Sequence, residues 1–154
     1  MEMLSGITAP MLVVPGNAES RDELAAAAGS NMTVLHGSGC EAGGLRFYGL
    51  GYAVPPTPFG GWSCDLTEAE AGTMLAPCDA ADVLIVHSPP KGLADRTGQG
   101  VSIGSVAVRD AIARIQPTLA LCGHVHDCWG ESGSIGRTEV INLGPTVHWF
   151  EIAP

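Results

Sequence analysis

The sequence has few basic residues, no paired cysteine motif and no long hydrophobic run. Lys and Arg number 7 against 16 Asp and Glu, which gives a formal net charge of −9 at pH 7. A chain this acidic is not expected to bind duplex nucleic acid through a basic face. Its five cysteines include no Cys-x-x-Cys pair, which indicates a reducing, cytoplasmic setting. No apolar run reaches the ~18–20 residues that span a bilayer, so no membrane partner is expected.

What is present is typical of one globular domain, residues 1–154. The composition is 45% hydrophobic and only 15% charged, which excludes a disordered tail. Gly and Pro are spread along the chain and therefore separate many short elements instead of marking one linker. Expected helices alternate with strands early in the chain, and strands cluster late. This order predicts an α/β domain with mixed β-sheets in a layered sandwich.

The expected elements follow from apolar spacing and capping residues. Helical periodicity and N-cap residues predict three helices, over 20–28, 67–76 and 104–115. Short apolar or alternating runs predict strands at 11–14, 45–52, 82–86, 118–122, 139–143 and 147–152.

Polar side chains that can bind a metal follow three of the apolar runs. Asn17 follows the first run, His87 follows 82–86, and His124 and His126 follow 118–122. Ligands bind beyond the carboxyl ends of strands in α/β sheets, so we expect these side chains to converge. An amide oxygen with imidazole nitrogens suits Zn, Mn, Fe or Ni.

These residues stand in an order that resembles the calcineurin-like metallophosphoesterases. Gly16-Asn17-Ala18-Glu19 is similar to the family's Gly-Asn-His-Asp/Glu motif, and His87 to its isolated histidine. Gly123-His124-Val125-His126 is similar to its terminal Gly-His-x-His motif. Residues 87–92 and 140–145 also resemble small, stand-alone prokaryotic-type members. The resemblance implies two facing mixed sheets with helices outside, in an α/β/β/α sandwich.

The resemblance also implies a function, the hydrolysis of phosphate mono- or diesters at a site with two divalent metal ions (Mn, Fe, Zn or Ni). Carried over by motif, Asn17, His87 and His124 bind one ion and His126 binds the other, and all four are candidate catalytic residues. Metal ions would activate a water molecule as the nucleophile. The expected partner is a small phosphoester.

The chain departs from the family pattern in two respects. It contains no Asp-x-His and no Gly-Asp, the motifs that supply further ligands and the bridging carboxylate. We therefore expect a domain without the first strands of the fold, with only one ion fully coordinated. Ala18 replaces a histidine that helps to protonate the leaving group, so either another residue serves or substrates with good leaving groups are favoured. Glu19 is expected to support its turn. The alternative is a non-catalytic metal-binding or scaffold relative of the same fold.

A rival interpretation is a closed structural zinc site formed by Cys122, His124, His126 and Cys128. Its spacing supplies only one of the two ligand pairs that compact zinc sites use, and it leaves Asn17 and His87 unexplained.

Several other residues are weaker candidates. His36 has no motif around it, and His148 is expected to be structural in a last strand. The remaining candidates are Lys91 and Arg96 as phosphate contacts, Phe59, Trp62 and Trp129 as pocket walls, and Asp95 and Asp127 as hydrogen-bond partners of metal-bound histidines. Missing strands would leave sheet edges without cover, which predicts either a homo-oligomer formed through those edges or an unstable chain.

Overall fold

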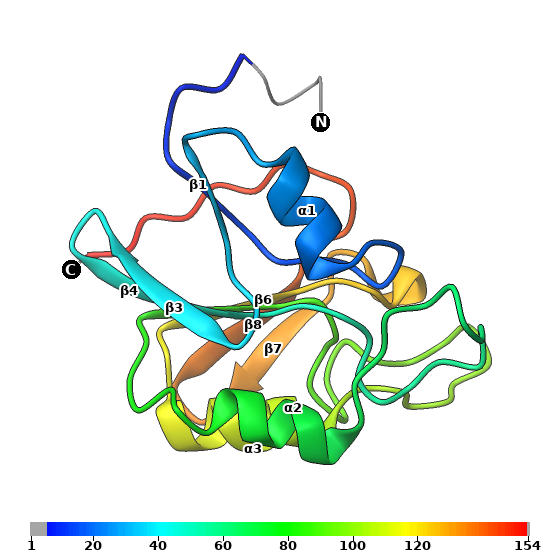
Figure 1. Ribbon diagram of the computed structural model, residues 1–154. Helices are drawn as coiled ribbons and strands as arrows, with labels where there is room; N and C mark the ends of the chain where they lie inside the picture. Colours follow the sequence, from blue (N-terminus) through cyan, green and yellow to red (C-terminus); the bar gives the residue numbers. More distant parts are fainter. Residues whose placement is uncertain (1–5, 154) are drawn as a thin grey trace.

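A computed structural model describes residues 6–153 of the chain. Its main sheet has six strands in the order β3-β4-β5-β6-β8-β7 (Figure 1). Their bounds are β3 Ser38–Ala42, β4 Leu45–Leu50, β5 Val83–Val86, β6 Leu119–Cys122, β7 Ser132–Ile135 and β8 Thr138–Asn142. The four inner strands run parallel, and the two edge strands pair antiparallel to their neighbours. The carboxyl ends of the inner strands therefore meet at one edge of the sheet.

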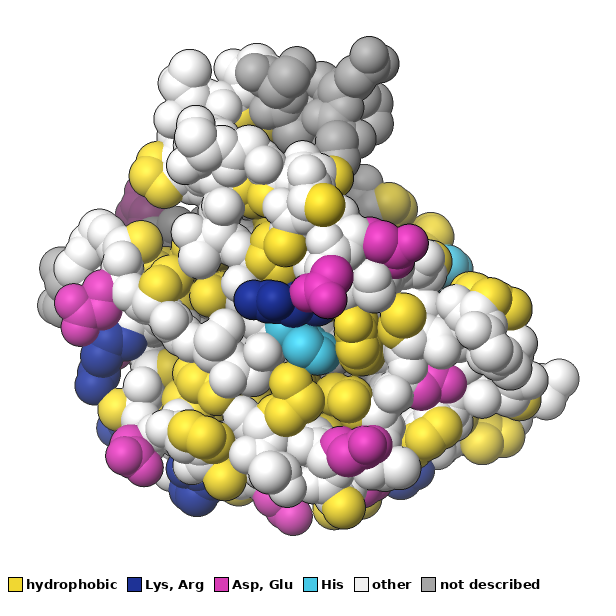
Figure 2. Space-filling view, viewed as in Figure 1, with side chains coloured by type: hydrophobic (Ala, Val, Ile, Leu, Met, Phe, Trp, Pro, Cys, Tyr) yellow, Lys and Arg dark blue, Asp and Glu magenta, His cyan; other side chains and the backbone are white. Residues whose placement is uncertain are grey.

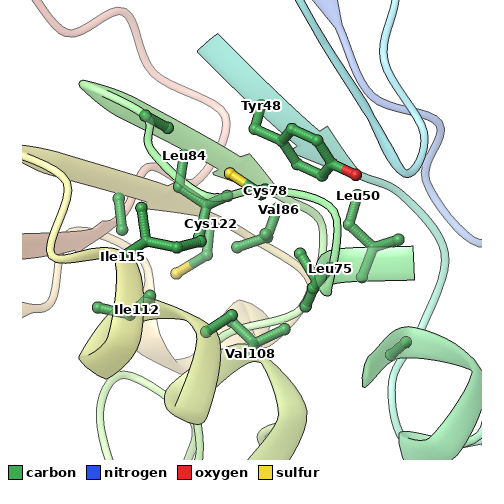
Figure 3. Packing of buried hydrophobic residues seen from close by; sticks show 14 of the residues in the cluster. Tyr48, Leu50, Leu75, Cys78, Leu84, Val86, Val108, Ile112, Ile115 and Cys122 are labelled. Atoms are coloured by element: carbon green, nitrogen blue, oxygen red, sulfur yellow. The ribbon is translucent and has the colours of Figure 1, made fainter. Parts of the chain in front are cut away.

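Two helices cover one face of this sheet, and the main core lies between them and the strands (Figure 1). They are α2 Glu68–Leu75 and α3 Val106–Ile115. Figure 3 shows Ile112 and Val108 of α3 and Leu75 of α2 packed against Leu84 and Val86 of β5. Each helix begins where its sequence provides a side-chain cap, Thr67 for α2 and Ser105 for α3.

A smaller parallel sheet lies over the opposite face, formed by β1 Met11–Val13 and β2 Met32–Val34. Helix α1, Arg21–Ala27, lies outside it (Figure 1). The two sheets approach closely at Gly49 of β4, where an added Cβ would come within 2.5 Å of the Leu35 side chain. Glycine is therefore required there for the layers to meet. The layer order is helices, main sheet, small sheet, helix.

The α/β layered architecture is the one that the sequence predicts, with exceptions at particular strands. The predicted strand over 147–152 is wrong, because this segment has no regular structure. Val147 is 80% and Trp149 92% exposed, so the apolar alternation there has no sheet to face. The sequence interpretation also missed β2, β3 and β7 as strands. Strands β3 and β7 contain Gly, Ser and few large apolar residues, and β2 is only three residues long, so each gives a weak strand signal.

The small sheet has two strands among the described residues. Within residues 6–153, β1 and β2 pair only with each other, and their apolar side chains are half-buried. The edge strands of the main sheet are instead rich in small and polar residues. Among the described residues, no helix is both long and apolar enough to cross a membrane.

Replacing Leu84 with alanine tests the main core. Leu84 is completely buried between the sheet and the helices, so Leu84→Ala should lower the free energy of unfolding by about 2–5 kcal/mol. Urea unfolding followed by circular dichroism measures the change. The control Val147→Ala removes apolar atoms from an exposed side chain and should change stability by less than about 0.5 kcal/mol. Equal effects of the two substitutions would contradict this description of the core.

Candidate metal-binding site

Successive turns at the carboxyl edge of the main sheet are joined by backbone hydrogen bonds. The His87 amide, just after β5, donates to the Leu50 carbonyl of β4 at 2.9 Å. The His87 carbonyl then accepts from the Gly123 amide, just after β6, at 3.1 Å. The register of the parallel strands thus places the two histidine-bearing turns side by side, as the sequence predicts.

Three of the four predicted site residues come together there. His87 Nε2 lies 3.1 Å from Asn17 Oδ1 and 3.1 Å from His124 Nδ1. Asn17 reaches this point from the small sheet, since it follows β1, whereas the two histidines come from the main sheet. The donor group therefore joins the two layers of the fold.

The environment of these histidines favours neutral imidazoles. Burial, followed by the nearby His124 and His126, lowers the pKa of His87 to about 4. The pKa of His124 is also lowered, mainly by burial and then by His126. A neutral imidazole keeps the nitrogen lone pair that a metal ion needs.

His126 lies on the same cavity but outside this three-residue group. Its side chain is exposed and packs on Trp129, with ring centroids 4.7 Å apart. Within the part of the chain that the structure describes, no three His, Cys, Asp or Glu side chains form a metal-binding group. The convergent set is one asparagine with two histidines, an N/O donor set that fits one divalent cation. A second ion would need donors besides His126.

The orientation of the Asn17 amide is fixed by side chains that the sequence interpretation missed. Asn17 Nδ2 donates to Ser63 Oγ at 3.0 Å, which turns Oδ1 toward His87. Ser63 Oγ in turn donates to Asp65 Oδ1 at 2.6 Å, and Asp65 Oδ2 accepts from the Thr57 amide and hydroxyl. Nothing in the spacing of these residues indicates a link to Asn17, because they lie about forty or more positions away.

Asn142 fixes the turn that carries His124. Its fully buried side chain donates to the Gly123 carbonyl at 3.2 Å and to the Val125 carbonyl at 3.0 Å. His124 between them has a φ of 67°, a left-handed conformation that costs energy for a non-glycine residue. In the sequence, residues 140–145 are notable only for their resemblance to small members of the family. The structure shows that Asn142 in this stretch holds the Gly123 and Val125 carbonyls.

A cavity of about 910 Å³ opens over the donor group. Its lining includes Asn17 and the three histidines, with Ala18, Lys91 and three aromatic side chains, Phe59, Trp62 and Trp129. The predicted pocket walls are therefore all present. On the face in Figure 2, the described Lys and Arg side chains stand among acidic and hydrophobic ones and form no continuous basic stripe.

The carboxylates proposed to support the histidines have other partners. Buried Asp95 accepts hydrogen bonds from the Gly92 amide, the Gly104 amide and the Ser102 hydroxyl. Exposed Asp127 accepts from the Gly98 amide at 2.7 Å. Both predictions of a histidine partner are wrong, because these side chains close the loop after His87 instead.

Several remaining candidates are also placed by their contacts. Lys91 Nζ donates to the Ser102 carbonyl at 2.7 Å and borders the cavity, whereas Arg96 donates to the Gly100 carbonyl within an exposed loop. His36 accepts from the Gly51 amide and packs against Tyr52 with the two rings tilted by 48°, outside the cavity lining. His148 caps an exposed turn through the Leu143 carbonyl. Glu19 accepts from the Gly16 amide at 2.6 Å and supports its turn as expected.

The cysteines near His124 do not form a zinc site. Cys122 Sγ points into the main core and donates to the Ile141 carbonyl, whereas Cys128 Sγ donates to the Arg96 carbonyl in a separate small cluster. The interpretation as a mixed Cys/His zinc site is therefore wrong. Side chains at successive positions of a strand and of the turn after it point in different directions.

Three curated proteins are similar to this chain, and two of them have the same name. Metallophosphoesterase domain-containing protein 1 of Homo sapiens and that of Mus musculus are each 30% identical over 132 residues. The match covers 81% of this chain and 39% of each relative. A UPF0046 protein of Caenorhabditis elegans is 33% identical over 118 residues, covering 73% of this chain and 38% of that protein. The chain thus spans about 39% of the length of the curated relatives it matches most fully. No protein-family model matches it.

Solved structures confirm the fold. One is 26% identical with a TM-score of 0.71, and the match covers 89% of this chain and 58% of that one. The TT1561 protein of Thermus thermophilus has a TM-score of 0.62 at 18% identity, covering 88% of this chain and 63% of that one.

Removing the Asn142 amide tests its hold on the His124 turn. Asn142→Leu removes two side-chain hydrogen bonds at a buried place, although each carbonyl keeps one backbone amide as a donor, so the free energy of unfolding should fall by about 1–3 kcal/mol. Asn31→Leu is a matched control, since Asn31 Nδ2 also donates to two carbonyls but at an exposed position. Water can replace that amide, and we expect a loss below about 1 kcal/mol. Urea unfolding of both variants measures these losses. Similar losses of unfolding free energy in the two variants would contradict the role of the buried Asn142 amide.

The Asp95 carboxylate should make stability depend on acid pH. Burial alone would raise the pKa of Asp95, but the hydrogen bonds from Ser102, Gly92 and Gly104 hold it below its ordinary value. The stabilisation is therefore complete above the unfolded-state pKa of about 3.9 and is lost as pH falls through the lower folded-state pKa.

Asp95→Asn should accordingly destabilise the protein by about 1–3 kcal/mol at pH 7 and by less at pH 3. Thermal unfolding at both pH values measures the difference, with Asp110→Asn on the exposed side of α3 as the control. A loss at pH 3 equal to that at pH 7 would show that the ionised carboxylate is not the stabilising group.

Proposed function

Because this chain belongs to the metallophosphoesterase family, we propose that it forms a metal-dependent site for the hydrolysis of phosphate mono- or diesters. The observation that carries the proposal is the convergence of Asn17 Oδ1, His87 Nε2 and His124 Nδ1 at the cavity floor. These atoms belong to residues whose motifs resemble the metal-binding motifs of the family. We place the activity in a reducing, cytoplasmic setting, in keeping with five free cysteines.

We assign one divalent cation to Asn17, His87 and His124, and a second to His126 with donors not yet identified. Such ions, when bound, lower the pKa of a water molecule and stabilise the oxygens of the phosphoryl group. The role of this chain's residues is to hold the donors in place. Ser63 orients the amide of Asn17, and Asn142 fixes the turn of His124.

The cavity lining carries one basic side chain, Lys91, and one acidic side chain, Asp127, so bound metal ions would supply the net positive charge that an anionic substrate needs. Lys91 is the single Lys or Arg side chain among the described residues of the cavity lining, and its ammonium group is held by the Ser102 carbonyl. A phosphate entering the cavity would meet this ammonium and the donor group together. Ala18, also in the lining, cannot donate a proton to the departing alcohol.

A non-catalytic metal-binding or scaffold role is the second candidate. It is favoured by the absence of Asp-x-His and Gly-Asp from the 154 residues and by Ala18 in place of histidine. It predicts that a divalent cation binds without hydrolysis. Retention of the convergent donor group favours the hydrolase over a scaffold that binds no metal, because a site released from catalysis need not keep its metal-binding residues.

The two functions are separated by Mn²⁺-dependent hydrolysis of bis(4-nitrophenyl) phosphate. We expect turnover above the metal-only rate, and a decrease of about 100-fold or more in His124→Ala, since even outer partners of metal ligands contribute about 10–100-fold. His148→Ala is the matched control, because this exposed histidine lies in a turn outside the cavity lining and should leave turnover unchanged.

Folding of each variant is checked by circular dichroism before the assay. Metal binding without turnover in the unmodified chain would favour the scaffold role. Turnover that survives His124→Ala would contradict the assignment of the site.

A further inference from the structure

An exposed aromatic pair lies at the cavity that contains the donor group. The rings of Phe59 and Trp62 stack with centroids 5.3 Å apart and planes inclined by 16°. Phe59 is 50% and Trp62 61% exposed, although both line the cavity together with His87 and His124. A contiguous group of exposed apolar side chains beside a polar cavity is a feature of ligand-binding surfaces.

The loop that carries this pair is tied directly to the donor group. Its far end returns to Asn17 through two contacts, the Cys64 amide to the Asn17 carbonyl at 2.8 Å and the Asn17 side-chain amide to Ser63 Oγ at 3.0 Å. Asp65 holds the near end through the Thr57 amide at 2.8 Å. The aromatic rings are therefore held in a fixed relation to Asn17, one of the proposed metal-binding residues.

The cavity is larger than a phosphate group requires. Its volume of about 910 Å³ falls in the ~300–1,000 Å³ range of small-molecule pockets. The donor group and Lys91 supply the part of the lining that suits an anion, and Phe59 and Trp62 supply a flat apolar part. A ligand that fills both parts carries an anionic group and a planar ring.

Ala18 restricts the alcohol part of such a ligand independently. Without a proton donor at this position, substrates whose alcohol leaves as a stable anion are favoured. Phenols ionise near a pKa of about 10, as the tyrosine side chain does, and leave far more readily than alkyl alcohols. The absence of a proton donor at Ala18 and the presence of the aromatic pair therefore both favour esters with an aryl leaving group.

We propose that Phe59 and Trp62 form a subsite for an aryl leaving group, so that the preferred substrates are aryl phosphoesters. This inference rests on the proposed hydrolytic function. In the reaction, a water oxygen forms a bond to phosphorus while the bond from phosphorus to the aryl oxygen breaks. The phenolate departs, and the proton lost by water goes to solvent, so no oxidant or further reactant is needed.

The subsite is tested by binding, apart from turnover. Isothermal titration in Mn²⁺ buffer compares phenylphosphonate with methylphosphonate, two stable analogues that differ only in the group attached to phosphorus. We expect phenylphosphonate to bind about 10-fold more tightly, from stacking and burial of the ring. Trp62→Ala should reduce this ratio to near 1, by weakening the binding of phenylphosphonate more than that of methylphosphonate. Trp149→Ala, at a side chain that is 92% exposed and outside the cavity lining, should keep the ratio.

The outcomes separate the subsite from the hydrolytic function. His124→Ala should weaken both phosphonates alike and keep their ratio. A ratio that falls in Trp62→Ala supports the subsite even if no ester is hydrolysed. Equal affinities in the unmodified chain, no binding of phenylphosphonate, or a ratio unchanged in Trp62→Ala would overturn it. Sedimentation of the same variant is a further test, since loss of an oligomer with an unchanged ratio would identify the pair as a protein interface.

Discussion

The parallel pairing of β5 with β6 is the constraint on which the site depends. It aligns Val83 with Leu119 and Ile85 with Leu121, so the two strands end at the same level. The turns that follow are then joined through the His87 carbonyl and the Gly123 amide. Helices α2 and α3 hold this pairing from one face by burying the alternate side chains of the strands. Displacing the register by one residue would turn the buried side chains to the other face and separate the histidines.

The second requirement is close contact between the two sheets, because Asn17 comes from the smaller one. Gly49 permits that contact, and Ser63 then sets the direction of the Asn17 amide. The polar atoms that meet at the cavity floor are thus held by three separate devices: strand register, a glycine at the sheet interface, and a hydrogen-bonded loop. The same loop carries the aromatic pair, so the proposed aryl subsite and the proposed metal-binding residue Asn17 share one support.

Much of this arrangement could be predicted from the sequence. Apolar runs followed by Asn17, His87 and His124 indicate strand ends, and strand ends in α/β sheets converge. The helices were found because their caps and apolar spacing are local signals, as with Thr67 and Ser105. The contacts of Ser63, Asp65 and Asn142 could not be predicted, since they depend on tertiary approach between distant segments. The strand expected over 147–152 failed for a related reason. Alternation gives a strand only where a neighbouring strand and a face to cover exist.

Asn17, His87 and His124 are proposed to hold one divalent cation. Titration of the chain with Co²⁺, followed by visible absorption, tests this binding without relying on turnover, because the spectrum reports nitrogen ligands. We expect saturation at one strongly bound ion per chain, with a spectrum distinct from that of aqueous Co²⁺ and absent from His87→Ala. A spectrum that stays that of the aqueous ion, or one that His87→Ala leaves unchanged, would show that these residues do not bind the cation.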